Sequence, residues 1–566
     1  MSIVTPSGFR DVLAEEAAAR EAITRAVQDL FASRGYVPVE TPTLEVMGVL
    51  EAGGRVPATP FKFFDSRGDL LAMRPDVTLQ VARMGATRLA AEPGPLRLRY
   101  TQRVFREADS DAREGARELT QMGVECLGEE GPAADAEIIG LFSEALATAG
   151  VEEFSLAVAT VAPLRALLDR SGAPEAWKAA VLDAYHASNF VELDRLTDVA
   201  DPALAGLAAG TAPAYAAAIR ALPRIRGGRD AIEAARALTA PLGCAGGLDD
   251  FERTYELLAA AGDGARRVLV DFSAMSSFDY YTGIVFAAYS PRLGTPLGSG
   301  GRYDRLAAAF GADRPAAGFA FYLEQAMAAA ADGDAPAARP LRVAVPKGAL
   351  NADAIDALAA AGLDVTGLAD PGRALVVSNP GVDYIIVRPS DAPAFVALGA
   401  ADCGICGKDS LLEAAPDVVE LADLRFGACR FVVAEPVGAA EAVAERYRRL
   451  GSIRVATKYP RITRAHYART GVQVEIVYLH GNIELAPLTG LAERIVDITA
   501  TGTTLRENSL EVVEEVLGST ARFFANPCAF RTDDRITALA QALADHAATA
   551  DYAPIPGSSQ PGGPAS

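Results

Sequence analysis

Apolar and polar residues recur along this chain with two different periods. Residues 11–35 place apolar side chains on one helical stripe and charged ones such as Glu15 and Arg20 elsewhere, which predicts an amphipathic helix. Short apolar runs separated by turn residues then predict strands at 36–39, 61–64, 70–73, 96–105 and 120–127. One helix followed by such strands favours an α+β domain with mostly antiparallel strands.

Two stretches differ in composition from their surroundings. Residues 163–262 are rich in Ala and Leu at helical spacing, which predicts a helical insertion. Residues 329–340, AAADGDAPAARP, hold two Asp, two Pro and no large apolar side chain, and predict a linker between domains.

After the linker, predicted strands and helices alternate, as is typical of α/β architecture. The predicted strands are 341–345, 384–387, 403–405 and 522–525, the predicted helices are 352–361, 392–398 and 532–547, and a second α/β unit spans 453–505. Two such lobes joined by a crossing chain would place a ligand in the cleft between them.

A run of small residues stands between a predicted strand and a predicted helix. Ile495, Val496 and Ile498 indicate a short buried strand, and the helical spacing of the apolar residues from Leu510 to Leu517 predicts a helix. The capping-box pattern of 504–507 favours a helix start there. The backbone N–H groups and hydroxyls of the run make a candidate phosphate site, with an ordinary capped turn as the alternative. The run comprises Thr499, Ala500, Thr501, Gly502, Thr503 and Thr504.

The charge and the cysteine content of the chain argue against several classes of protein. The chain has 53 Lys and Arg against 73 Asp and Glu, a net charge of −20, which argues against an extended nucleic-acid surface. No stretch predicts a membrane span or a signal peptide, so we expect a cytoplasmic protein. Six scattered cysteines do not form a disulfide framework. We interpret Cys403 and Cys406 as buried small residues on a strand end, with zinc or redox chemistry as the alternative.

Motifs in the first part of the chain resemble the histidyl form of the class II aminoacyl-tRNA synthetases. They are 35–44 for motif 1, 105–106 with 117–125 for motif 2, 73–78, 278–283, and 300–304 with 318–320 before motif 3. The resemblance covers roughly residues 5–328. It implies a class II synthetase-like α+β domain, which we bound at 1–328 with the insertion at about 163–262.

Two departures separate this part from a working synthetase. Ser276 and Gln325 occupy positions where the family has arginines, and adenylate formation develops negative charge that needs such cations. The amino-acid pocket is retained, so the resemblance implies a domain that binds histidine as an effector without activating it. In that pocket Asp76, Gln121 and Glu125 would hold the amino group, Thr78 would assist, and Tyr280 and Tyr281 would form the walls.

The second part of the chain resembles the short-form catalytic subunit of ATP phosphoribosyltransferase. The matching segments are 345–348, 387–393, 401–409, 456–460, 484–487 and 497–505, within about 341–540. One departure is Ala349, where the family has arginine. The resemblance implies a two-lobed α/β domain of the periplasmic-binding-protein type at 341–548, with the second lobe at about 436–505 and a disordered tail at 549–566. Long forms of the enzyme add their own regulatory domain, for which we expect no room here, whereas short forms use a separate synthetase-like subunit.

The resemblance implies transfer of phosphoribose from phosphoribosyl pyrophosphate to ATP, in histidine biosynthesis, with Mg²⁺ as cofactor. Residues 499–504 would anchor the 5-phosphate, and Asp497 and Glu484 would act at the ribose or its magnesium. Lys347, Arg388 and Lys408 are candidates for contacts with ATP or pyrophosphate. No protein ligand to the metal is assigned. We expect a homo-oligomer that binds these substrates and histidine but neither nucleic acid nor membrane.

Two other functions stay open. A non-enzymatic histidine or small-molecule sensor is the main alternative, because two-lobed domains also bind ligands without catalysis and Ala349 can signal lost activity. An aminoacyl-tRNA ligase is disfavoured by Ser276, Gln325 and the negative charge. Release of pyrophosphate from ATP and phosphoribosyl pyrophosphate distinguishes an enzyme from a sensor.

Overall fold

The computed structural model describes residues 4–52, 59–107, 115–261, 267–274, 280–331, 339–499 and 502–555. They form two compact units. The first contains residues 1–338 and the short segment 527–533, and the second contains residues 339–526 and 534–566. Within the described ranges, no helix combines the length and apolar character that crossing a bilayer requires.

A mixed sheet forms the centre of the first unit. Its described strands run in the order β1, β5, β6, β12, β11, β10, β7, β9, β8. Neighbours are antiparallel except for β1 with β5 and β7 with β9, so the mainly antiparallel prediction is confirmed. The strands are β1 (Val37–Pro38), β5 (Leu96–Phe105), β6 (Glu118–Leu127), β12 (Ala316–Tyr322), β11 (Gly298–Arg302), β10 (Ile284–Tyr289), β7 (Ser155–Thr160), β9 (Arg267–Asp271) and β8 (Arg226–Gly227).

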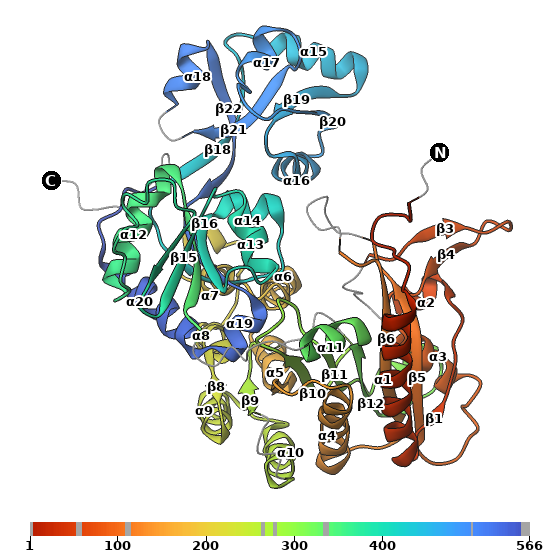
Figure 1. Cartoon of the computed structure of the whole chain (residues 1–566). Coiled ribbons are helices and arrows are strands. Elements are labelled where there is room, and N and C mark those ends of the chain that lie inside the picture. The colour runs from red at the N-terminus through yellow and green to blue at the C-terminus, as the bar shows by residue number, and fades with distance from the viewer. Residues whose placement is uncertain are drawn as a thin grey trace. The chain divides into compact units, whose positions relative to one another are not determined.

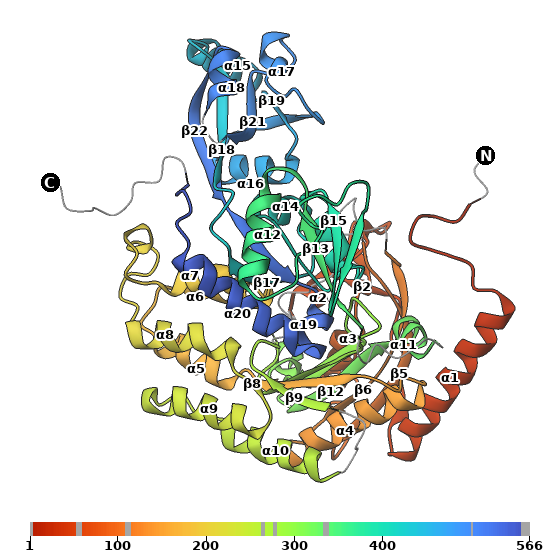
Figure 2. The same ribbon diagram turned by 60° about the vertical axis from the view of Figure 1, so that its left-hand side comes forward.

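Two helices, α1 (Ala14–Ser33) and α4 (Pro132–Thr148), cover one face of this sheet (Figure 2). Phe31 of α1 and Phe142 of α4 pack on Phe319 of β12, with ring centroids 5.8 and 4.9 Å away. Burial of these aromatic rings fixes the helices on the sheet. The short helix α3 (Thr78–Ala86) contacts β6. At its start, Val77 and Thr78 bond to the side chains of Gln121 and Glu125 of that strand. A small sheet of β2 (Leu44–Val46), β4 (Leu70–Met73) and β3 (Lys62–Phe64) precedes α3 in the chain.

The predicted insertion is helical. Trp177 is fully buried there and its indole N–H donates to the carbonyl of Leu196 at 2.8 Å, so the tryptophan serves the core of these helices. In Figure 1 they are drawn from light orange through yellow to yellow-green. They are α5 (Ala162–Arg170), α6 (Glu175–His186), α7 (Phe190–Thr197), α8 (Pro213–Ala221), α9 (Arg229–Thr239) and α10 (Leu248–Ala260).

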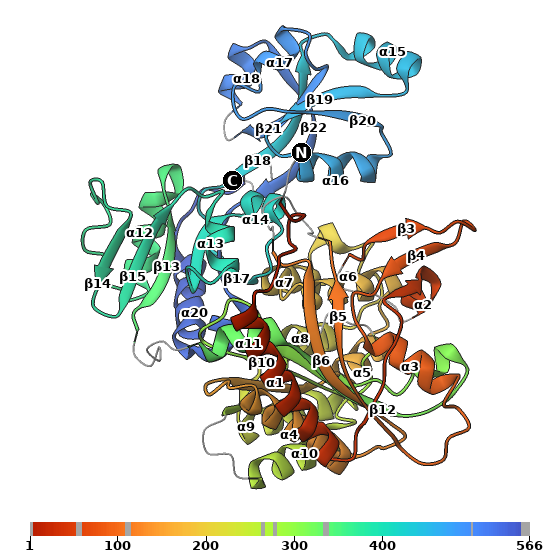
Figure 3. The same cartoon turned by 45° about the vertical axis from the view of Figure 1, so that its right-hand side comes forward.

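The second unit has two sheets with separate apolar cores (Figure 3). The first sheet has the order β14 (Val376–Asn379), β15 (Val382–Val387), β13 (Leu341–Pro346), β16 (Cys403–Gly407), β23 (Ala521–Ala525), β17 (Val419–Asp423). The second has the order β20 (Val474–Tyr478), β19 (Ile453–Thr457), β21 (Arg494–Thr499), β18 (Cys429–Pro436), β22 (Leu510–Ser519). The chain passes from the first sheet to the second between β17 and β18 and returns between β22 and β23.

Helices connect these strands as the alternating pattern predicts. They are α12 (Asn351–Ala360), α13 (Ala392–Ala397), α14 (Lys408–Ala414), α15 (Ala440–Leu450), α16 (Pro460–Thr470), α17 (Leu485–Leu488), α18 (Thr503–Glu507) and α20 (Asp534–Thr549). The segment before α20 forms a separate helix, α19 (Pro527–Thr532). Cys403 and Cys406 are buried on β16, as the apolar interpretation predicts. Most of the predicted disordered tail, from residue 556 on, lies outside the described residues.

The helix predicted from Leu510 to Leu517 is wrong. These residues form β22, which pairs antiparallel with β18 and has two register irregularities. Such bulges break the strict alternation of a strand, so the apolar positions resemble a helical stripe. The capping box is also wrong, because α18 begins at Thr503 directly after Gly502, whose φ is 71°. The N-cap residue of the helix is therefore Gly502 in a left-handed conformation, and Thr504 lies inside the helix.

Candidate functional site

The first site is centred on the carboxylate of Glu125, on β6. Three hydroxyls donate to it: Thr78 to Oε1 at 2.7 Å, Tyr100 to Oε1 at 3.2 Å, and Tyr303 to Oε2. Glu125 is only 1% exposed. Burial raises its pKa to about 8, and the hydroxyl donors oppose that rise.

The remaining predicted pocket residues lie around this carboxylate. Gln121 donates through Nε2 to Oδ2 of Asp76 at 2.8 Å and accepts at Oε1 from the N–H of Val77 at 3.0 Å. Oδ1 of Asp76 accepts from the N–H of Thr78 at 2.8 Å. The structure therefore brings Asp76, Thr78, Gln121 and Glu125 together as predicted, with their amide and carboxylate orientations fixed by hydrogen bonds.

Aromatic rings and glycines shape the pocket. Tyr280 and Tyr281 have ring centroids 4.8 Å apart, and Tyr280 lies 5.6 Å from Tyr303. A Cβ on Gly318 would lie 1.8 Å from Oε2 of Glu125, and one on Gly301 would lie 2.6 Å from the ring of Tyr281. Glycine is required at both positions because the functional side chains occupy the space of any side chain there.

A buried ion pair supports this wall of the pocket. Arg302 contacts Asp135 at 2.7 Å and Asp304 at 3.0 Å. Asp304 in turn accepts from the hydroxyl of Thr282 at 3.1 Å, one residue after Tyr281. The network thus joins β11 to the tyrosine segment.

The pocket between these side chains is small. The cavity among these side chains has a volume of about 30 Å³, which is the space of about one water molecule. An amino acid with an imidazole side chain needs more, so a ligand of that size can enter only if the walls move.

Of the two positions where this chain lacks the arginines of the synthetases, the structure describes one. In the orientation that satisfies both ends of its amide, Gln325 donates to the carbonyls of Pro296 at 2.7 Å and Leu297 at 3.1 Å. This neutral side chain is turned to the backbone and supplies no charge for a phosphate. Ser276 lies outside the described residues.

The second site lies at the carboxyl ends of β19 and β21 in the second unit. These strands are parallel, with Thr457 opposite Val496, so Lys458, just after β19, and Asp497 of β21 are the next positions along the two chains. Burial raises the pKa of Asp497, the negative charge of Glu484 adds to that rise, and the positive charge of Lys458 opposes it. The predicted Asp497 and Glu484 are therefore electrostatic neighbours, with an exposed lysine beside them.

The predicted phosphate loop begins at Thr499, after Asp497 and Ile498. Thr499 is buried, and its Oγ1 accepts from the N–H of Gly502 at 2.8 Å. Thr503 and Thr504 are exposed at the start of α18. Ala500 and Thr501 lie outside the described residues. The described part of the loop is a tight turn held by its own threonine.

The cations predicted in the first lobe lie at neighbouring strand ends. The N–H of Lys347, after β13, donates to the carbonyl of Val387 at 2.8 Å, and Arg388 follows Val387 on β15. Both side chains are exposed. The parallel register thus brings Lys347 and Arg388 to the same edge of the sheet.

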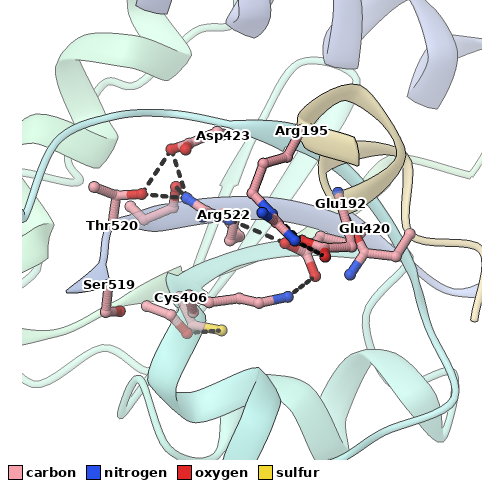
Figure 4. A network of polar contacts seen from close by, with 12 residues as sticks. Glu192, Arg195, Cys406, Glu420, Asp423, Ser519, Thr520 and Arg522 are labelled. Atoms are coloured by element: carbon pink, nitrogen blue, oxygen red, sulfur yellow. Dashed lines mark hydrogen bonds and ion pairs between the residues drawn. The ribbon is translucent and has the colours of Figure 1, made fainter. Parts of the chain in front are cut away.

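Lys408 has a different environment. Its Nζ pairs with Oε2 of Glu420 at 2.5 Å, and Oε1 of Glu420 pairs with Arg522 at 3.0 Å. Arg522 also contacts Asp423 at 2.5 Å (Figure 4). This network joins α14, β17 and β23, where the chain passes between the two sheets, and the structure does not bring Lys408 to Asp497.

The residues of these sites that are not among the predicted ones include Tyr100, Tyr303, Gly318 and Lys458. The last three stand inside recognised segments, at 300–304, 318–320 and 456–460, which is the signal that would have found them. Tyr100 is a single aromatic residue on a predicted strand, and only the pairing of β5 with β6 shows that it reaches Glu125.

The same residues offer few ligands for a metal ion. Among the described residues, no three His, Cys, Asp or Glu side chains gather in a way that could hold a metal by themselves. Mg²⁺ needs fewer protein ligands, since one or two carboxylates with substrate phosphates suffice. Asp497 and Glu484 fit that requirement.

Comparisons with known proteins agree with both halves. A family model described as histidyl-tRNA synthetase matches residues 8–326, and one described as ATP phosphoribosyltransferase matches residues 388–545. An ATP phosphoribosyltransferase of Rubrobacter xylanophilus is 53% identical over 193 residues, which are 34% of this chain and 89% of that protein. An ATP phosphoribosyltransferase regulatory subunit of Moorella thermoacetica is 39% identical over 326 residues, 57% of this chain and 81% of that protein.

A solved structure gives the same result for the first part. The regulatory subunit/histidyl-tRNA synthetase from Bacillus halodurans aligns with a TM-score of 0.52 and 28% identity, covering 68% of this chain and 93% of that one. Fold and sites thus define a phosphoribosyltransferase that carries a unit of the histidyl-tRNA synthetase family. The chain belongs to the ATP phosphoribosyltransferase family, and it joins the regulatory and catalytic subunits of that family in one polypeptide.

Proposed function

We propose that the second unit joins ATP to phosphoribosyl pyrophosphate at the strand ends that carry Asp497, Glu484 and Lys458. The observation that carries this proposal is their convergence directly before the Thr499–Thr504 loop. N1 of the adenine attacks C1 of the ribose, the bond from C1 to the pyrophosphate oxygen breaks, and phosphoribosyl-ATP and pyrophosphate are the products.

Each residue has a role that its position allows. The loop binds the 5-phosphate through N–H groups and hydroxyls, Asp497 accepts from the ribose hydroxyls, and Glu484 holds the ribose or its magnesium. Mg²⁺, when bound, neutralises charge on the departing pyrophosphate. Lys458, Lys347 and Arg388 contact ATP or pyrophosphate. No covalent nucleophile is needed, so positioning and electrostatics supply most of the rate.

The test is product formation by the intact chain with Mg²⁺. We expect phosphoribosyl-ATP and pyrophosphate in equal amounts, detected by mass spectrometry and a coupled pyrophosphate assay. Asp497→Asn should lower kcat/KM for phosphoribosyl pyrophosphate by on the order of a hundredfold, because one preorganised contact to the reacting sugar is lost. Binding of both substrates without product would support the non-enzymatic sensor instead.

We also propose that the first unit is a histidine sensor. The described pocket offers carboxylate and hydroxyl groups for an ammonium ion and aromatic walls for an imidazole. Feedback inhibition then requires that histidine favour one arrangement of the chain over another, since a ligand shifts an equilibrium only by its differential affinity.

The domain organisation follows from this proposal. We assign residues 1–328 to the regulatory domain, 329–340 to the linker and 341–548 to the catalytic domain. The two sheets with separate cores support a two-lobed catalytic domain of the periplasmic-binding-protein type. We further propose that the chain acts as a homo-oligomer.

A further inference from the structure

Helix α19 is part of the first unit although it follows a strand of the second. β23 ends at Ala525 in the second unit, residues 527–533 belong to the first unit, and α20 begins at Asp534 in the second. The chain of the catalytic part therefore contributes a short segment to the regulatory unit and then returns.

The segment is built into the core of the first unit. Cys528 is fully buried in an apolar cluster. The other buried members are Ala157 of β7, Tyr289 of β10, and Ala274, which follows β9 in the chain. The carbonyl of Phe530 accepts from Arg226 at 2.9 Å, and the guanidinium of Arg226 lies 4.4 Å from the centre of the Phe530 ring. Such burial and pairing are those of a core element rather than of a surface loop.

Arg531 makes the central contact of this segment. Its Nε lies 3.3 Å from Oδ2 of Asp271, with 4% of the arginine side chain and none of the aspartate side chain exposed. Oδ1 of Asp271 accepts from the N–H of Ser273 at 2.9 Å and from its hydroxyl at 2.6 Å. The guanidinium also lies 4.9 Å from the ring centre of Tyr289.

These two partners flank the tyrosines of the histidine pocket in sequence. Asp271 is the last residue of β9 and Tyr289 is the last residue of β10, and Tyr280 and Tyr281 lie on the chain between them. Arg531 thus holds the strand that enters this segment and the strand that leaves it.

The cavity among the pocket side chains measures about 30 Å³, the space of about one water molecule, so histidine bound there would displace the walls. Tyr280 and Tyr281 form the wall on the side of this segment. A shift of that wall would act on β9 and β10, which lie on either side of β7, and Arg531 contacts a residue of each of these two strands.

Both ends of α19 continue into firmly held parts of the second unit. The N–H of Asn526 donates to the carbonyl of Asp402 at 2.9 Å, and the side chain of Asp402 pairs with Arg339 at 2.7 Å. Arg535 donates to the carbonyl of Arg339 at 3.2 Å. A displacement of α19 therefore reaches the residues that precede β13 and β16.

We propose that α19, through the buried Arg531–Asp271 pair, transmits the filling of the histidine pocket to the catalytic unit. The inference rests on the proposed histidine regulation and names its route. Neither residue belongs to the pocket or to the strand ends proposed for catalysis.

The test uses the intact chain with both charges removed together, Asp271→Asn with Arg531→Met, because a single change would leave a buried charge unpaired. Arg253→Met is the matched control, since Arg253 is exposed in the same unit and pairs only with Glu256 in the described residues. Three quantities are measured for each protein: histidine affinity by calorimetry, uninhibited turnover, and the change in apparent substrate affinity caused by saturating histidine.

In the wild type and the control, we expect histidine to weaken apparent substrate affinity roughly five- to 150-fold. In the double variant we expect histidine affinity and uninhibited turnover within about twofold of wild type, with the effect of histidine reduced towards one. Hydrogen exchange of residues 527–533 should change on addition of histidine in the wild type and the control, but not in the double variant.

Three results would contradict the proposal. Full inhibition of the double variant would show that the signal does not pass through the pair. Loss of histidine binding would show that the pair shapes the pocket. A wild type that binds histidine without inhibition would remove the proposed regulation and this route with it, whereas a wild type that makes no phosphoribosyl-ATP would contradict the proposed catalysis alone.

Discussion

Thr78 donates a hydrogen bond of 2.7 Å to Oε1 of Glu125, across from the hydroxyl of Tyr303 on Oε2. Each oxygen of the buried carboxyl thus has a hydroxyl partner before any ligand is present. The carboxyl is solvated by the protein itself, and its protonation state decides what it can bind.

Histidine binding should release a proton from Glu125. With a pKa of about 8, the carboxyl of the unliganded protein is mostly protonated at pH 7, and an ammonium ion favours its ionised form. We expect close to one more proton released per histidine by the wild type than by Glu125→Gln, measured by calorimetry at pH 7 in buffers of different ionisation enthalpy. Protons released by the ligand itself are the same for both proteins, so the difference between wild type and Glu125→Gln reports the carboxyl alone. Equal proton counts would show that the ammonium does not meet Glu125.

The same group should make stability depend on pH. Its pKa is raised from 4.5 to about 8, so the folded protein binds more protons than the unfolded chain between these values and loses stability as pH rises through that window. Glu125→Gln should therefore gain stability over the wild type from pH 5 to 8, by at most about 1.4 kcal/mol per pH unit. Urea unfolding of both proteins at the two pH values measures the difference. A gap that does not widen with pH would contradict the raised pKa.

Gly318→Ala should damage the pocket without touching catalysis. The new Cβ would lie 1.8 Å from Oε2 of Glu125 and 2.5 Å from the backbone carbonyl oxygen of Val124, so the carboxylate must move from its hydroxyl partners and the local pairing of β12 with β6 must shift. We expect histidine binding to weaken at least about tenfold while uninhibited turnover stays unchanged. Gly140→Ala controls for added bulk in this unit, since no atom lies within 4 Å of its Cβ position and its φ is not in the left-handed region.

Much of the fold could be predicted because its pattern is local. β4 and β5 have the predicted bounds, and the alternation after the linker gave β13, α12, β15 and α13 to within two residues. Leu510–Ser519 could not be assigned correctly, because its bulged pairing with β18 is a long-range feature that disguises the period of a strand.

Prediction of the site residues was also limited where their contacts depend on long-range pairing. Asp76, Gln121 and Glu125 could be placed together from motif resemblance, but the role of Tyr100 depends on the register of β5 with β6. Lys408 follows a strand end, as a substrate-binding cation would, and only tertiary structure shows its pairing with Glu420. No local signal indicates that residues 527–533 belong to the first unit.

Loss of Lys458 should lower the catalytic rate, whereas loss of Lys408 should lower stability. Lys458→Met removes an exposed charge beside Asp497 and should lower kcat/KM for phosphoribosyl pyrophosphate by on the order of a hundredfold. Lys408→Met removes one partner of the buried Glu420, which also pairs with Arg522, and should lower the thermal unfolding temperature more than the rate. Steady-state kinetics and calorimetry of both variants measure this. An equal loss of rate would return Lys408 to the substrate-binding residues.

The first unit should not activate histidine. Gln325 is neutral and turned to the carbonyls of Pro296 and Leu297, so it cannot stabilise the charge that develops on ATP phosphates. We expect no histidine-dependent exchange of pyrophosphate into ATP by the intact chain. Appreciable exchange would overturn the assignment of this unit as a sensor.

The most direct test of the account is histidine inhibition of phosphoribosyl-ATP formation by the wild type and by Glu125→Gln. We predict that histidine inhibits the wild type, and that Glu125→Gln keeps uninhibited turnover but needs at least about tenfold more histidine for half inhibition, because a neutral amide pairs poorly with an ammonium ion. If the folded Gln variant is inhibited at the histidine concentration that inhibits the wild type, the effector does not bind at Glu125 and the regulatory role of this pocket is wrong.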